Sequence, residues 1–239
     1  MAIDQKKLEE LVHRGVGDLG AAISALLIHI GDKLGLYKAM AGAGPMTPQE
    51  LAKRTGTAER YIREWLCNQA AGGYVSYDSA TGSFSLSDEQ ALCLADETSP
   101  AFLPGGFESA ASVFVDEPKF TAAFRSGKGV GWHEHDARLF SGTERFFRPG
   151  YNANLVSSWI PALEGVEEML REGAKVADVG CGHGASTIVM AQAYPKSKFL
   201  GFDYHGPSIE RARLAAAEAG VSGRVTFEAA GAKDFAGKD

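Results

Sequence analysis

The sequence has few cysteines, and their arrangement indicates neither a metal centre nor a disulfide framework. Cys67, Cys93 and Cys181 are odd in number, and no two of them lie at the spacing of a metal-binding pair. Free thiols in a reducing compartment are the simplest interpretation. We therefore expect a cytoplasmic protein without a metal site.

A secretory leader and a long membrane-spanning run are also missing from the pattern. Residues 1–10 are charged and mixed in sign, with no apolar core behind a basic start. The longest apolar stretch, Leu19 to Ile30, falls short of the ~20 residues of a membrane span and contains Ser24 and His29. We expect a buried helix there and no membrane association.

Basic residues do not predominate. Lys and Arg number 24 against 30 Asp and Glu, which gives a formal net charge of −6 and argues against a general binder of polyanions. Hydrophobic residues make up 45% of the 239 residues, enough for a packed core in one large domain or two small ones.

The first hundred residues predict short helices followed by a hairpin. Thr47-Pro48-Gln49-Glu50 has the pattern of a capping box with proline in the first turn, and a second helix runs from Thr57 to the Gly72-Gly73 pair. Residues 74–77 and 83–86 have strand composition around a turn. Helix, turn, helix and hairpin indicate a winged helix-turn-helix domain over residues 1–100.

Residues 101–170 are rich in aromatic side chains and predict a helical linker that also forms a pocket wall. The aromatics could line an apolar ligand pocket or fill the core between domains, and we expect a mixture. Within this region His133 and His135, in Trp132-His133-Glu134-His135-Asp136, are candidate catalytic general bases. A His-x-His metal site and a polar capping loop are the alternatives.

From residue 171 the pattern changes to alternating strands and helices. Strands are predicted over 175–179, 199–203 and 224–230, with helices over 185–194 and 207–219. Such an order requires a parallel sheet with right-handed crossovers. The predicted fold class is therefore α + α/β, in which residues 171–239 form a partial Rossmann-like domain with its first three strands.

The first strand of that domain ends in Asp178-Val179-Gly180-Cys181-Gly182-His183-Gly184. Glycines let the chain turn off the strand tip and let a ligand approach the backbone, while the following helix directs N–H groups at that ligand. Asp203 closes the second strand, where a carboxylate can accept hydrogen bonds from both hydroxyls of a ribose.

Two cofactors fit this pattern. Gly180, Gly182 and Ala185 formally satisfy the glycine pattern of a nicotinamide site. S-adenosylmethionine (SAM) is favoured because the glycines alternate through Gly184, because Asp178 precedes the first glycine by two positions, and because the unit begins late, behind a winged helix.

Several longer segments carry a family resemblance. "MTPQELAKRTGTAERYIREWL" (46–66), "RFFRPGYNANLVSSWIPALEGV" (145–166) and "VADVGCGHGASTIVMAQAYPKSKFLGFDYH" (176–205) resemble the class I SAM-dependent methyltransferases with an N-terminal winged-helix dimerisation domain. One subgroup, which contains a mycobacterial protein described as a transcriptional regulator, is especially similar. The resemblance implies transfer of a methyl group to the O, N or C atom of a small-molecule acceptor and a homodimer formed through the N-terminal domain. The acidic net charge leads us to expect no nucleic acid partner.

The resemblance also assigns roles at the cofactor site. Gly180, Gly182 and Gly184 would form the SAM loop, with Cys181 as a compact residue within it rather than a thiolate nucleophile. Asp178 would orient the amino-acid end, Asp203 would hold the ribose, and Tyr204 would lie beside the adenine. Ala232 and Lys233 would border the adenine, and Tyr151 would close over the cofactor unless it is linker core. Gly231 replaces an acidic residue of many relatives, so a backbone group or Asp234 would have to accept from the adenine.

The resemblance further implies seven strands, of which this sequence shows three. We therefore expect a C-terminally truncated chain that is inactive alone. Two other functions stay open: a winged-helix DNA-binding regulator and a non-catalytic SAM-fold scaffold. Across residues 47–78 four basic and four acidic side chains cancel, which disfavours contact with phosphates.

Overall fold

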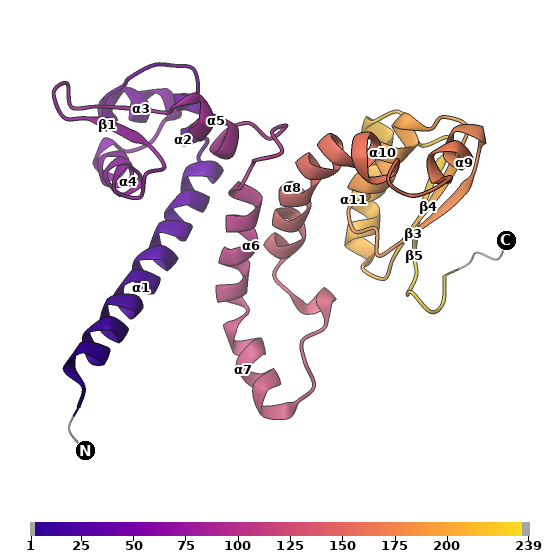
Figure 1. Ribbon diagram of the computed structural model, residues 1–239, viewed down its shortest axis with the longest axis horizontal. Coiled ribbons are helices and arrows are strands. Elements are labelled where there is room, and N and C mark those ends of the chain that lie inside the picture. The colour runs from indigo at the N-terminus through magenta and orange to yellow at the C-terminus, as the bar shows by residue number, and fades with distance from the viewer. Residues whose placement is uncertain (1–2, 236–239) are drawn as a thin grey trace. The chain divides into compact units, whose positions relative to one another are not determined.

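The computed structural model describes residues 3–235, and the chain divides into two compact units, Met1–Glu97 and Thr98–Asp239 (Figure 1). The boundary lies close to the end of the predicted winged-helix domain. The second unit contains both the aromatic-rich region and the parallel sheet. The further division of this unit at residue 170 stays a prediction.

The first unit is the predicted winged helix-turn-helix domain. The predicted capping box forms, with the Thr47 hydroxyl accepting from the Glu50 N–H, and a second box forms where the Ser87 hydroxyl accepts from the Gln90 N–H. Leu36, Tyr37 and Leu51 are among the side chains buried at its centre. Its elements are α1 (Gln5–Lys33), α2 (Leu36–Met40), α3 (Pro48–Thr55), α4 (Glu59–Ala71), the antiparallel pair β1 (Ser76–Asp78) and β2 (Ser83–Ser85), and α5 (Asp88–Leu94).

Helix α1 corrects the expectation of a buried helix. It spans 29 residues, and of these only Ile28, His29 and Gly31 are buried. By length and hydropathy alone it could cross a membrane, a test that helices of soluble proteins also pass. Gly31 does not break the helix: a Cβ there would lie 2.4 Å from the Trp65 ring, so glycine permits α4 to approach α1 closely.

The second unit begins with helices that pack closely on one another. A Cβ on Gly105 of α6 would lie 2.5 Å from the Phe146 nitrogen of α8, so the two backbones almost touch. Helix α8 continues through Pro149 into a π-helical turn. The elements are α6 (Pro104–Val115), α7 (Glu117–Ser126), a short 3-10 turn η1 (Trp132–Glu134), α8 (Ala137–Asn154), the π turn η2 (Leu155–Trp159) and α9 (Val166–Glu172).

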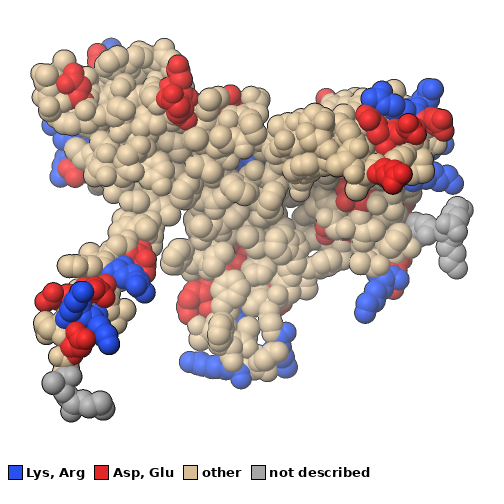
Figure 2. Space-filling view, in the orientation of Figure 1, with Lys and Arg blue, Asp and Glu red and all other residues tan. Residues whose placement is uncertain are grey.

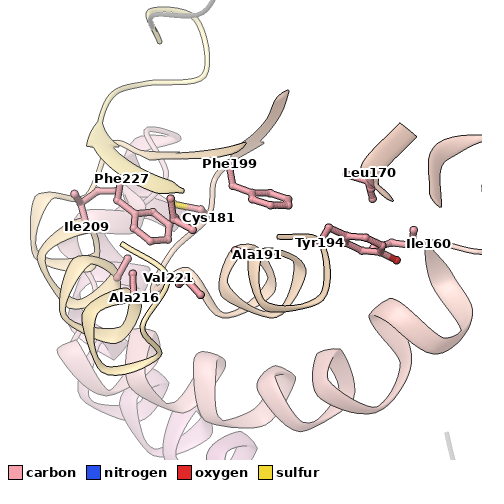
Figure 3. Close-up of a cluster of buried hydrophobic side chains, with 12 residues drawn as sticks. Ile160, Leu170, Cys181, Ala191, Tyr194, Phe199, Ile209, Ala216, Val221 and Phe227 are labelled. Atoms are coloured by element: carbon pink, nitrogen blue, oxygen red, sulfur yellow. The ribbon is translucent and has the colours of Figure 1, made fainter. Parts of the chain in front are cut away.

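A three-stranded parallel sheet in the order β3-β4-β5 completes this unit and confirms the predicted strand–helix alternation. Its elements are β3 (Lys175–Val179), α10 (Ala185–Ala193), β4 (Lys198–Asp203), α11 (Gly206–Glu218) and β5 (Val225–Ala229). Phe199 and Phe227 of the sheet pack with Ala191 of α10 and Ile209 of α11 in one buried cluster (Figure 3). This core fixes the carboxyl ends of β3 and β4, where the glycine loop and Asp203 lie.

Candidate functional site

A cavity of about 540 Å³ opens at the carboxyl ends of β3 and β4, within the range of small-molecule sites. In open α/β sheets ligands bind at this edge. The walls come from the glycine loop, the ends of β4 and β5, and one face of α8. The lining residues are Trp132, Phe140, Thr143, Glu144, Phe147, Tyr151, Asp178, Val179, Gly180, Cys181, Gly182, His183, Ala185, Ser186, Asp203, Tyr204, Ser208, Ala230 and Ala232.

The three glycines of the loop differ in what surrounds them. All have positive φ, which favours glycine. A Cβ on Gly180 or Gly182 would meet no protein atom within 4 Å, and both residues line the cavity. A Cβ on Gly184 would lie 2.4 Å from the Phe227 ring, outside the cavity lining. The first two glycines therefore leave ligand space open, whereas Gly184 lets α10 start against the sheet.

Asp203 holds the glycine loop in place. Its side chain is buried, and its two oxygens accept from the Gly182 N–H at 3.0 Å and the His205 N–H at 2.8 Å. The N–H groups of Gly180 and Cys181 both donate to the Phe202 carbonyl. Each carboxylate oxygen has two acceptor positions, so Asp203 keeps capacity for two further donors such as ribose hydroxyls.

Asp178 occupies the other end of the loop. One of its oxygens accepts from the Ser186 hydroxyl at 3.0 Å and the Thr187 hydroxyl at 2.6 Å, both in the first turn of α10. Burial, followed by the Asp178 charge, raises the pKa of Tyr151 above its ordinary value. The Tyr151 phenol is therefore neutral at pH 7 and available as a hydrogen-bond donor beside the carboxylate.

One face of α8 supplies the apolar wall. Phe140, Thr143, Glu144, Phe147 and Tyr151 follow one another at steps of three, one, three and four, so they project from the same side of the helix. The sequence had indicated aromatics for a pocket in general but had not singled out this stripe. The helical spacing was the signal that could have found it.

Cys181 and His183, the residues between the three glycines, both line the cavity. Cys181 is buried in the same cluster as Phe227 (Figure 3), and a Cβ placed on Gly201 would lie 2.9 Å from the Cys181 sulfur. Burial, with Asp178 and Asp203 nearby, raises the pKa of its thiol to about 12, which is unsuited to a nucleophile. His183 lines the cavity, and burial lowers its pKa below the ordinary value, so its ring is neutral at pH 7.

His133 and His135 both lie outside the cavity lining. The His135 ring contacts Asp116 through Nδ1 at 2.9 Å and packs beside Phe120, and its side chain is nearly buried. Hydrogen bonds from Lys119, the Asp136 N–H and His135 lower the pKa of Asp116 to about 2. His133 stands edge-on to Tyr204 at 5.8 Å between ring centroids. The catalytic role expected for these histidines stays a prediction.

The remaining predicted residues surround the end of β5. Tyr204, Ala230 and Ala232 line the cavity, whereas Lys233 does not. The Asp234 N–H donates to the Gly231 carbonyl, and a Cβ on Gly231 would lie 3.4 Å from an Asp234 oxygen. Asp234 thus lies beside Gly231. The ligand contacts themselves stay predictions.

Comparison with known proteins matches both units to protein-family models. Residues 21–96 match the Rv2258c-like winged HTH domain, and residues 170–238 match a methyltransferase domain. The chain combines an Rv2258c-like winged helix-turn-helix domain with a methyltransferase domain. This pairing agrees with the resemblance seen in the sequence.

Solved structures share the fold across almost the whole chain. The mitomycin 7-O-methyltransferase MmcR matches with a TM-score of 0.66 and 21% identity over 92% of this chain and 66% of its own. CalO1, a methyltransferase of calicheamicin biosynthesis in its SAH-bound form, matches with a TM-score of 0.56 and 21% identity over 96% of this chain and 67% of its own. SAH is S-adenosylhomocysteine, the demethylated form of SAM.

Curated relatives match over a smaller part of the chain. The tRNA (guanine-N(7)-)-methyltransferase of Shewanella halifaxensis (strain HAW-EB4) is 39% identical over 61 residues, which is 26% of this chain and 26% of that protein. The chain thus spans about a quarter of this relative and about two thirds of the solved structures.

The family match and the fold indicate SAM as the cofactor, and the cavity fits it. The open space in front of Gly180 and Gly182 is a cradle that a Cβ would fill. Asp203 retains acceptor positions at the strand end where a ribose would lie, and an oxygen of Asp178 is held by α10 at the opposite end. Among residues 3–235 no group of three or more His, Cys, Asp or Glu side chains could hold a metal ion.

Proposed function

We propose that this protein transfers a methyl group from SAM to a small-molecule acceptor, at an O, N or C atom. The observation that carries the proposal is the cavity itself. The open space in front of Gly180 and Gly182, with the Asp203 carboxylate at one end, continues to the aromatic side chains on one face of α8. The likeness of the fold to small-molecule O-methyltransferases supports the choice of acceptor class.

The residues of this chain position and desolvate the reactants. SAM supplies an already activated methyl group, so the protein's contribution is alignment in a dry site. Gly180 and Gly182 would receive the amino-acid end, Asp203 would hold the ribose, and Tyr204 would flank the adenine. The aromatic face of α8 would exclude water from the acceptor. His183, neutral at pH 7, can take up a proton at the same cavity.

A calorimetric titration of SAH tests the cofactor assignment, with NADH as the competing cofactor. Asp203→Asn is the informative variant because it keeps one acceptor for the backbone N–H groups while removing the charge. We expect SAH to bind the wild type, the variant to bind at least about tenfold more weakly, and NADH not to bind. NADH binding with no SAH binding would contradict the proposal.

The exposed face of α1 supports a homodimer formed through the N-terminal unit. Figure 2 shows both signs of charge at the N-terminal end of α1 and an uncharged surface beyond it. Apolar residues recur along the helix at three- and four-residue steps and are exposed. Exposing such a stripe to water is unfavourable, so it is typical of a surface that packs against a partner. Arg14 and Asp18 lie within the helix and disfavour a membrane span. The stripe comprises Leu8, Val12, Val16, Leu19, Ile23 and Leu26.

Sedimentation velocity tests the dimer. We expect the wild type to sediment as a dimer and the double variant Leu19→Glu with Ile23→Glu as a monomer, because two carboxylates cannot be buried in an apolar interface. Leu214→Glu, at an exposed apolar position of α11, is the matched control and should stay dimeric. A monomeric wild type at micromolar concentration would remove this part of the proposal.

The DNA-binding alternative receives little support from α4, which corresponds to the second helix of the motif. Arg60 is paired with Glu64 and Arg63 with Glu59, each one helical turn apart. Acidic and basic side chains therefore balance along α4, whereas contact with phosphates requires a predominantly basic face. We propose no nucleic acid partner. Salt-dependent binding of duplex DNA would contradict this view.

A further inference from the structure

The ionisable side chains that line the cavity are strongly biased in sign. In the part of the chain that the structure describes, three carboxylates line it, those of Glu144, Asp178 and Asp203, and no Lys or Arg does. His183 is the remaining candidate for a positive charge, and its burial favours the neutral ring. The cavity therefore presents an acidic interior.

Two of these acids belong to the cofactor end. Asp178 is held by the hydroxyls of the first turn of α10, and Asp203 is held by the Gly182 and His205 N–H groups. Glu144 is different because it projects from α8, four residues after Phe140 and three before Phe147. It is the carboxylate set within the aromatic wall.

The cationic partner of Glu144 does not line the cavity. Arg148 approaches Glu144 with a distance of 3.4 Å between Nη1 and Oε1, yet Arg148 lines a neighbouring cleft of about 160 Å³ rather than the cavity itself. Glu144 lines both spaces, and its side chain is only 19% exposed. A ligand in the cavity would thus meet the Glu144 carboxylate, whereas its partner Arg148 lines the neighbouring cleft.

Aromatic ring faces reinforce this polarity. Trp132, Phe140, Phe147 and Tyr151 all line the cavity. Ring faces carry negative electrostatic potential and attract cations, and they also stack on planar molecules. A planar ring bearing a positive charge would stack on the aromatic side chains and be attracted by the Glu144 carboxylate. An anion would be repelled by that carboxylate and would find no Lys or Arg among the described lining residues.

We propose that Glu144 is a specificity-determining residue and that the methyl acceptor is an aromatic compound carrying a protonated amino group, selected over aromatic carboxylates. This inference rests on the proposed function, because it assigns the space beside the aromatic face of α8 to the methyl acceptor. It names the substrate class of that same site.

The test uses three indoles of similar shape and different charge on the full chain saturated with SAH. Tryptamine is cationic, 3-methylindole is neutral and indole-3-acetate is anionic at pH 7. SAH is chosen because it lacks the sulfonium charge of SAM. Calorimetry gives the dissociation constant of each probe for the wild type, Glu144→Gln, Glu144→Asp and Glu218→Gln. Glu218 is the matched control, since it lines the neighbouring cleft but not the cavity.

We expect tryptamine to bind the wild type at least about tenfold more tightly than indole-3-acetate, with 3-methylindole between them. Glu144→Gln should reduce that ratio to about threefold or less, while Glu144→Asp and Glu218→Gln keep it. Thermal melting confirms that each variant is folded, and the conservative Asp variant separates loss of charge from loss of packing.

The outcomes distinguish the two proposals. Failure of SAH to bind the wild type would overturn the proposed function. SAH binding with equal affinities for the indoles, with preference for indole-3-acetate, or with no indole bound at millimolar concentration would overturn the inference about Glu144 alone. An unchanged ratio in Glu144→Gln would do the same.

Discussion

Gly184 and Gly180 provide a matched pair for separating what the glycine loop does for folding from what it does for binding. Both have positive φ, 77° and 86° respectively, so an alanine at either position pays the same left-handed backbone cost of ~1–2 kcal/mol. Only at Gly184 would the new methyl also meet protein atoms. Its Cβ would lie 2.4 Å and 2.8 Å from two Phe227 ring atoms and 3.1 Å from the Ala212 Cβ.

The magnitudes follow from these contacts. Overpacking a core commonly costs ~1–3 kcal/mol, so Gly184→Ala should lower the free energy of unfolding of the second unit by ~2–5 kcal/mol in all. Gly180→Ala should lower it by only ~1–2 kcal/mol. The order reverses for SAH: Gly180→Ala fills the open cradle and should weaken binding strongly, whereas any folded Gly184→Ala protein should bind with a smaller loss.

Urea unfolding read by hydrogen exchange and mass spectrometry measures the two units separately. This separation matters because a chain with two compact units need not unfold in one step. Peptides from the first unit serve as the internal standard in both variants. Equal destabilisation by the two substitutions, or a greater loss of SAH affinity in Gly184→Ala, would refute the reasoning.

Further predictions concern the thiols and the acid side chains. At pH 8 iodoacetamide should modify the exposed Cys67 rapidly and leave Cys181 intact, since Cys181 is buried with a pKa of about 12; comparable rates in the native protein would contradict its placement. Asp116→Asn should lower the urea midpoint of the second unit at pH 7, because the carboxylate form accepts from Lys119 and His135. Since the folded pKa of Asp116 is lowered to about 2, the stabilisation is present above an ordinary carboxyl pKa of about 4 and is lost as the pH falls towards 2. The gap in midpoint between wild type and variant should therefore shrink below about pH 4, and a gap that widens there would contradict the assignment.

Much of the fold could be predicted because local chemistry and tertiary structure agree. The capping box at Thr47 starts a helix where predicted, and β3 ends at Val179 immediately before the glycines. The aromatic-rich region was harder, because α8 runs through Pro149, a residue that usually interrupts a helix. Tertiary packing of α8 against α6 overrides that local signal.

The site residues could be predicted where they lie in one segment of the sequence, and less well where the fold brings separate segments together. Gly180, Gly182, Asp178 and Asp203 lie within a continuous motif, and all four line one cavity. Glu144 could not be singled out, because its importance depends on which face of α8 meets the sheet edge. The prediction that α1 is buried was wrong for a related reason. An apolar pattern predicts that a helix face is shielded from water, but the shielding surface need not belong to the same chain.

We propose that the cavity at the ends of β3 and β4 is the SAM site. Hydrogen exchange of the full chain, measured with and without saturating SAH, tests it most directly. We predict slowed exchange in peptides covering residues 178–187 and 202–206, and unchanged exchange across residues 47–84 of the winged-helix unit. Protection confined to the winged-helix unit, or no protection at a concentration that saturates binding, would contradict the account.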